Sequence, residues 1–122
     1  MKITVTGKNM DISDTIYDHV TSKLSHLEKF IQSKENQEIL AEVELGLRSL
    51  HHKKGDVYRA EINLTVDGEL SRSVSKKSDL LEAIDDSCSN IERQLRRSKR
   101  KKGSLMRRGA RQAKELLMNW RK

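Results

Sequence analysis

The sequence is poor in cysteine, in aromatic residues and in long apolar runs, and each shortage excludes a class of protein. Cys88 is the single cysteine, which excludes an internal disulfide and a multi-cysteine zinc site and fits a reducing compartment. Only 34% of the 122 residues are apolar and only four are aromatic, so we expect no large buried active-site cavity. No run approaches about 18 apolar residues and the amino terminus alternates in polarity, so we expect no membrane span, no signal peptide and a cytoplasmic location.

Acidic residues are almost absent from the last quarter of the chain. Residues 1–92 contain 12 Lys or Arg and 17 Asp or Glu, whereas residues 93–122 contain 13 and one. The first part therefore carries −5 and the second +12. A chain polarised in this way is expected to meet a polyanionic partner in one orientation, with its basic end toward the polyanion.

Residues 93–111 contain 10 Lys or Arg in 19 positions and no acid. An ordinary exposed helix mixes both signs, because a row of like charges repels itself unless a polyanion neutralises it. The arginine fork also suits phosphate oxygens. The run therefore predicts nucleic-acid contacts at Arg93, Arg96, Arg97, Lys99, Arg100, Lys101, Lys102, Arg107, Arg108 and Arg111.

Apolar periodicity predicts the first helix and three of the strands. Residues 1–6 alternate as a half-buried strand, and residues 39–47 and 58–66 alternate as two longer ones. Asp11 or Ser13 is expected to cap an amphipathic helix of about 20 residues. Its apolar side chains recur at intervals of three or four, at Ile12, Ile16, Val20, Leu24, Leu27 and Ile31.

Asp67-Gly68 predicts a tight turn into a third, short antiparallel strand, Glu69 to Ser75, whose apolar side would be Leu70 and Val74. Ser78-Asp79 is expected to cap a second helix without Gly or Pro as far as Lys102. The apolar side chains of that helix are Leu80, Ile84, Cys88, Ile91 and Leu95.

The element order β-α-β-β-β-α predicts an α+β fold in which two helices pack on one face of a four-stranded mixed sheet, as in double-stranded-RNA-binding domains. A helix between the first two strands allows their parallel pairing, and short turns make the other pairs antiparallel. The open face would lack an aromatic for stacking bases, which disfavours a single-strand reader. Its expected residues are Lys2, Thr4, Thr6, Glu42, Glu44, Arg59, Glu61, Asn63, Ser71, Ser73 and Ser75.

The apolar stripe of the second helix stops at Leu95, so its last turns should project beyond the sheet. Arg93, Arg97 and Arg100, with Arg96 beside them, are expected to form a ridge on the side away from the core. We therefore predict a binding domain over residues 1–102 and a basic amphipathic helical tail over residues 103–122.

No set of residues in the sequence predicts catalysis. His51-His52 are expected in a turn, His19 and His26 on a solvated or phosphate-contacting edge, and Cys88 as a small buried thiol. Asp85-Asp86 have an ordinary explanation in the helix dipole. We expect a protein that is not an enzyme, without a metal, a cofactor or a small-molecule substrate.

Several segments, in their order and spacing, resemble the bacterial ribosome hibernation promoting factors and the related protein Y, also called ribosome-associated inhibitor. The resemblance spans about residues 1–102. The chain departs from the family at Leu81, where an aromatic residue is usual. The matching segments are Ile3–Ser13, Lys23 with Leu27–Phe30, Asp79–Asp85, and Ile91–Arg97 followed by the basic run.

The resemblance implies binding to 16S rRNA between the head and body of the small subunit of the 70S ribosome, where messenger RNA and the A- and P-site tRNAs would lie. It implies inhibition of translation by occupancy. As partners we further expect small-subunit ribosomal proteins and no membrane. The rRNA contacts that it implies are Lys23, Lys29, Lys76, Lys77, Arg93, Arg96, Arg97, Arg100 and Lys101.

Two alternative functions remain open at this point. A double-stranded RNA-binding module would share the basic helix and bind isolated duplexes tightly, and a sigma-54-modulating regulator would bind polymerase components. Sedimentation of a lysate distinguishes them, because a ribosome-binding protein migrates with intact ribosomes.

Overall fold

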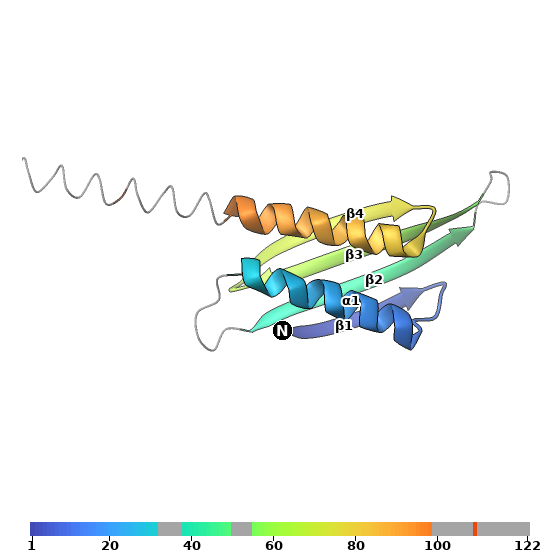
Figure 1. The fold of residues 1–122 in the computed structure, drawn as a ribbon, viewed down its shortest axis with the longest axis horizontal. Helices are drawn as coiled ribbons and strands as arrows, with labels where there is room; N and C mark the ends of the chain where they lie inside the picture. Colours follow the sequence, from blue (N-terminus) through green and yellow to red (C-terminus); the bar gives the residue numbers. More distant parts are fainter. Residues whose placement is uncertain (32–37, 50–54, 99–108, 110–122) are drawn as a thin grey trace, which may run out of the picture.

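The computed structural model describes residues 1–31, 38–49, 55–98 and 109. The sheet order is β1-β2-β3-β4, with β1 and β2 parallel and the other neighbours antiparallel. Two helices lie side by side on one face of this sheet (Figure 1), which confirms the predicted class and element order. The elements are β1 (Lys2–Lys8), α1 (Asp14–Leu27), a short 3-10 helix η1 (Glu28–Phe30), β2 (Ile39–Ser49), β3 (Asp56–Val66), β4 (Glu69–Lys77) and a second helix described over residues 80–98.

Side-chain caps begin both helices where the sequence predicts. Ser13 Oγ accepts a hydrogen bond from the Ile16 backbone N–H at 3.2 Å, and Asp79 Oδ1 accepts one from the Leu81 N–H at 3.0 Å. The α-helical part of α1 is shorter than predicted, because η1 tightens its end after Leu27. Ile12 and Ile31 pack against the core from outside α1.

The core lies between the helices and the sheet, and the predicted apolar faces build it. Residues of β2 and β3 that are paired across the sheet alternate together between this core and the open face. The buried apolar side chains are Val20, Leu24, Leu27, Ala41, Val43, Leu45, Ala60, Ile62, Leu64, Ala83, Ile84, Cys88 and Ile91.

The predicted faces of β4 are wrong. Leu70 and Val74 are 62% and 39% exposed on the open face, whereas Ser73 and Ser75 are buried beneath the second helix. The turn at Asp67-Gly68 sets the register, since it pairs Val66 with Glu69. Ser73 then lies opposite Ile62 and Ser75 opposite Ala60, and directly paired residues share a face of the sheet. Ser71, paired with Leu64, is also on the helix side.

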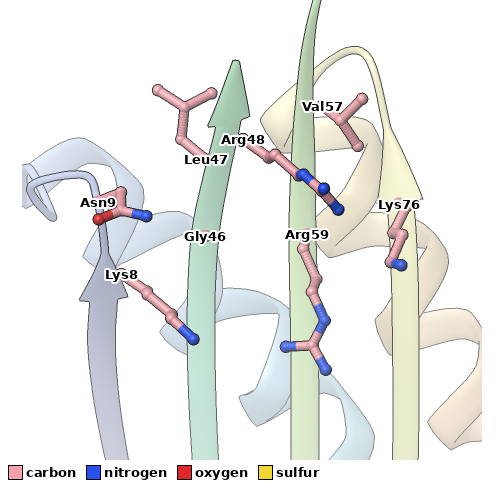
Figure 2. A pocket seen from close by; sticks show the side chains of 8 residues that line it. All are labelled: Lys8, Asn9, Gly46, Leu47, Arg48, Val57, Arg59 and Lys76. Atoms are coloured by element: carbon pink, nitrogen blue, oxygen red, sulfur yellow. The ribbon is translucent and has the colours of Figure 1, made fainter. Parts of the chain in front are cut away.

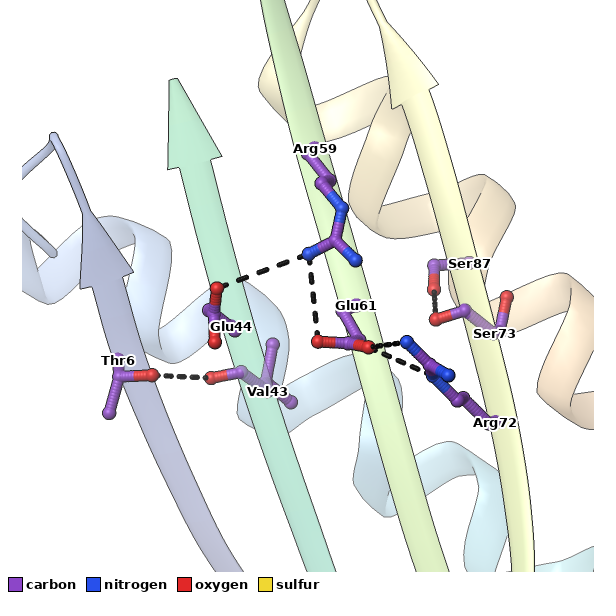
Figure 3. A network of polar contacts seen from close by, with 8 residues as sticks. All are labelled: Thr6, Val43, Glu44, Arg59, Glu61, Arg72, Ser73 and Ser87. Carbon is purple, nitrogen blue, oxygen red and sulfur yellow. Dashed lines mark hydrogen bonds and ion pairs between the residues drawn. The ribbon is translucent and has the colours of Figure 1, made fainter. Parts of the chain in front are cut away.

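The buried serines of β4 differ in their hydrogen bonds. Ser75 Oγ donates to Asp86 Oδ2 at 2.6 Å, which ties β4 to the second helix. Ser87 Oγ donates to the Ser73 carbonyl oxygen at 3.4 Å (Figure 3). Within the described part of the chain, Ser73 Oγ has no partner of its own.

We expect opposite effects from removing these two hydroxyls. Ser73→Ala should leave the free energy of unfolding unchanged or raise it by about 1 kcal/mol, because it removes a buried unpaired group. Ser75→Ala should lower it by about 1–3 kcal/mol, because Asp86 loses its donor. Urea denaturation of both variants measures the difference, and an equal loss in the two would contradict the observed difference in their hydrogen bonds.

Candidate nucleic-acid interface

The second helix presents arginines on the side away from its buried stripe. Ile84, Cys88 and Ile91 are 5% exposed or less, whereas Arg93 and Arg97, one turn apart, are exposed. The described part of the predicted ridge is thus confirmed as a solvent-facing surface. The rest of the ridge, Arg100, lies outside the described residues.

Arg93 and Arg97 line an open hollow of about 530 Å³ between the second helix and β4. Arg72 of β4 lines its other side, and the Gln94 side chain donates to the Arg72 carbonyl oxygen at 2.8 Å. Arg93 donates to Asn90 Oδ1 at the same site. Three arginines therefore line the hollow. The guanidinium groups of Arg93 and Arg97 have no carboxylate partner among the described residues, whereas that of Arg72 is hydrogen-bonded to Glu61 of β3. The Arg93 and Arg97 guanidinium groups suit phosphate oxygens.

Arg72 was missed by sequence reasoning as part of this hollow. It lies within the strand β4, far from the basic run of the sequence, and no local pattern marks it as a binding residue. Only the position of β4 beside the second helix places Arg72 opposite Arg93 and Arg97.

Lys29 and Arg96 meet on the other side of the second helix, at the ring of Phe30. The Arg96 guanidinium carbon lies 4.8 Å from the ring centroid and Lys29 Nζ lies 5.2 Å from it. Arg96 is also 3.6 Å from Glu92 Oε1, and Lys29 Nζ is 3.0 Å from His26 Nε2. The ring therefore holds two of the predicted site residues, from different helices, close together.

Lys23 lies over the contact between α1 and the second helix. Its Nζ is 3.6 Å from Asp85 Oδ1, and His19 Nε2 hydrogen-bonds the same oxygen at 2.8 Å. Asp85 thus joins the two helices, in addition to its place near the dipole of the second. Over the described ranges, no group of three or more His, Cys, Asp or Glu could hold a metal ion, while His51-His52 lie outside them.

Lys76 and Lys77 lie on opposite faces of the sheet. Lys76 pairs with Arg59 on the open face, whereas Lys77 pairs with Tyr58 on the helix side. Because successive residues of a strand point to opposite faces, the structure brings only Lys77 to the side of the helices. The remaining predicted contacts lie outside the described residues: Lys99, Arg100, Lys101, Lys102, Arg107, Arg108 and Arg111.

Cys88 is a buried thiol, as predicted. Burial raises the pKa of this thiol to about 12, the negative charge of Asp85 adds to the rise, and Lys23 opposes it. The neutral thiol that results is a poor nucleophile. A membrane span needs a helix that is both long and strongly apolar. Among the described residues, no helix meets these two conditions.

Comparison with known proteins bears on the family and the fold of this chain. A family model described as "Sigma 54 modulation protein / S30EA ribosomal protein" matches residues 3–103. A Bacillus subtilis protein named ribosome hibernation promotion factor is 27% identical over 101 residues, covering 83% of this chain and 50% of that protein. The protein of the same name from Deinococcus radiodurans is 30% identical over 95 residues, covering 78% and 47%. The chain spans about half the length of these curated relatives.

Solved structures share the fold. The N-terminal domain of Thermus thermophilus Protein Y matches with a TM-score of 0.66 and 33% identity, over 80% of this chain and 98% of that one. A ribosomal subunit interface protein from Coxiella burnetii matches with a TM-score of 0.64, over 81% of this chain and 98% of that one. At 18% identity, the second likeness concerns the fold alone.

Proposed function

Because the chain belongs to the sigma 54 modulation protein / S30EA ribosomal protein family, we propose that it is a ribosome hibernation factor. It binds the small subunit of cytosolic ribosomes through 16S rRNA phosphates, in the channel of messenger RNA and the A- and P-site tRNAs. Occupancy of that channel inhibits translation and preserves inactive ribosomes. The role requires binding and no catalysis.

The hollow between β4 and the second helix carries this proposal. Arg93 and Arg97 lie there without a carboxylate partner among the described residues, and the fork of each guanidinium can hold two phosphate oxygens. Arg72 borders the same hollow, with its own guanidinium paired with Glu61. A partner that fits such a surface offers closely spaced phosphates, as the backbone of structured RNA does.

Lys29 and Arg96 extend the proposed interface across the ends of both helices. Their cations lie over the Phe30 ring, so their side chains are held before RNA arrives. Less side-chain entropy is then lost on binding. Lys23 contributes at the junction of the helices, where Asp85 already holds its ammonium group.

We extend the proposal to the division of the chain. Residues 1–102 form the ribosome-binding domain, and residues 103–122 add affinity through further cations of the basic tail.

The proposal predicts that the protein sediments with purified small subunits and with 70S ribosomes, and not with isolated large subunits. In vitro translation should stop at a near-stoichiometric ratio of protein to ribosomes, because one bound copy occupies the channel. A denaturing gel of the inhibited reaction should show intact rRNA.

Three other outcomes would contradict the proposal. Cleaved rRNA would indicate an enzyme. Tighter binding to an isolated RNA duplex than to ribosomes would favour the double-stranded RNA-binding alternative. Capture by polymerase components without ribosome binding would favour sigma-54 modulation.

A further inference from the structure

A second basic hollow lies on the open face of the sheet, on the side opposite the helices. It has a volume of about 520 Å³ and lies where β1, β2 and β4 end and β3 begins. Figure 2 shows four cationic side chains projecting from separate strands around it. The lining residues are Lys8, Asn9, Gly46, Leu47, Arg48, Val57, Arg59 and Lys76.

Strand register creates this hollow. Lys8 of β1 pairs with Gly46 of β2, Gly46 pairs with Arg59 of β3, and Arg59 pairs with Lys76 of β4. The four residues therefore form one row across the sheet. Gly46 contributes no side chain to the row, which leaves open space between Lys8 and Arg59.

The cations of the row are incompletely neutralised. Arg59 lies 4.0 Å from Glu44 and 3.5 Å from Glu61 (Figure 3). Glu61 is shared, because Arg72 Nε also donates to it at 2.9 Å. The Arg72 hydrogen bonds lower the pKa of Glu61 despite the partial burial of this carboxyl, so it is ionised at neutral pH.

Lys8, Arg48 and Lys76 make no ion pair with any other described residue. Arg59 and Lys76 are also directly opposite each other on neighbouring strands, an arrangement that is destabilising for like charges. A bound anion in the hollow would remove this repulsion, because it would be attracted to all four cations at once.

We propose that this hollow binds the phosphate groups of a nucleotide. Its volume lies within the range of about 300–1,000 Å³ that is usual for small-ligand sites. The phosphates lie along the row of Lys8, Arg59 and Lys76, with Arg48 at the rim. Val57, on the same face of β3 as Arg59, gives the sugar or base an apolar surface. The nucleotide is either free or part of an RNA strand.

This site is distinct from the interface on the second helix. The hollow at Arg93 and the hollow at Gly46 are lined by different residues. Arg59 and Lys76 line only the second of them. Nucleotide binding in the second hollow does not depend on the proposed ribosome binding, so the two proposals can be tested separately.

Gly46→Val is the sharpest test, because it fills the hollow without removing a charge. A Cβ at this position meets its nearest neighbours at 3.7–4.0 Å, which is ordinary contact, and valine favours strands. The double variant Lys8→Gln/Lys76→Gln removes charge without adding volume. Lys2→Gln, on the same strand and face as Lys8 but outside the hollow, is the matched control.

The measurement is the change in backbone amide NMR shifts of the full chain on titration with pyrophosphate, with ADP and with a short single-stranded RNA. We expect saturable shifts at Lys8, Gly46, Arg59 and Lys76. Gly46→Val and the double lysine variant should each weaken binding at least about tenfold, and Lys2→Gln by no more than about twofold.

The probes distinguish the source of the phosphate. Saturation by ADP and pyrophosphate indicates a free nucleotide, whereas saturation by RNA alone indicates a strand. The proposal is overturned when none of the three probes shifts these amides beyond the effect of equal ionic strength, or when Gly46→Val binds as tightly as the parent. Sedimentation of Gly46→Val with ribosomes is scored separately, as a measure of the proposed function.

Discussion

Replacement of Arg93 and Arg97 together by Glu is expected to weaken ribosome binding by at least about 100-fold without unfolding the protein. Loss of a hydrogen bond to a charged group costs about 1.5–3 kcal/mol, and the introduced carboxylates also repel the phosphates. Both side chains are exposed on the side opposite the buried stripe of Ile84, Cys88 and Ile91. Sedimentation with ribosomes at several salt concentrations measures the loss.

Single variants separate a local contact from a general charge effect. Lys2→Glu changes the charge by as much as Arg97→Glu does, but on the first strand, outside both hollows. We expect Arg97→Glu to weaken binding strongly and to flatten the dependence of affinity on salt, since phosphate contacts are lost. Equal losses in the two single variants would show that net charge alone governs binding. Loss of cooperative unfolding in the double variant would show that the arginines support the fold.

Ile91→Ala is expected to lower the free energy of unfolding by about 2–5 kcal/mol, because it leaves a cavity between the second helix and the sheet. Ile91 is 0% exposed within the core cluster. Urea denaturation measures the loss, and ribosome binding of the protein that remains folded should be unchanged, because the arginines project from the opposite side.

Val74→Ala is the matched control for this cavity. Val74 is 39% exposed on the open face of β4, so its truncation should change stability by no more than about 0.5 kcal/mol. A large loss at Val74 with a small one at Ile91 would mean that the core lies on the other face of the sheet.

Long apolar patterns explain why most of the fold could be predicted. α1 buries Val20, Leu24 and Leu27 at helical spacing. Such an apolar stripe is stable only when it packs against another apolar surface. β2 and β3 alternate over enough residues to determine their inner faces. The basic run was equally visible, since charge is a property of the sequence itself.

β4 shows where sequence pattern fails. It has only two apolar residues, and hydrophobicity alone directs Leu70 and Val74 inward, although both are exposed. The buried serines that replace them are small enough to lie under the second helix. Ser75 keeps a hydrogen bond there, to Asp86, which offsets part of the cost of burial.

Local patterns are enough to predict the order of the four strands and two long helices, the apolar faces of both helices and of β1, β2 and β3, and the basic character of the second helix. Periodicity and charge are local properties, so a single segment is enough to show them. Which cations lie close together depends on the tertiary packing. Arg72 lines the same hollow as Arg93 and Arg97, and the row through Gly46 gathers charges from three strands, because strand register and packing join residues that are far apart in the chain.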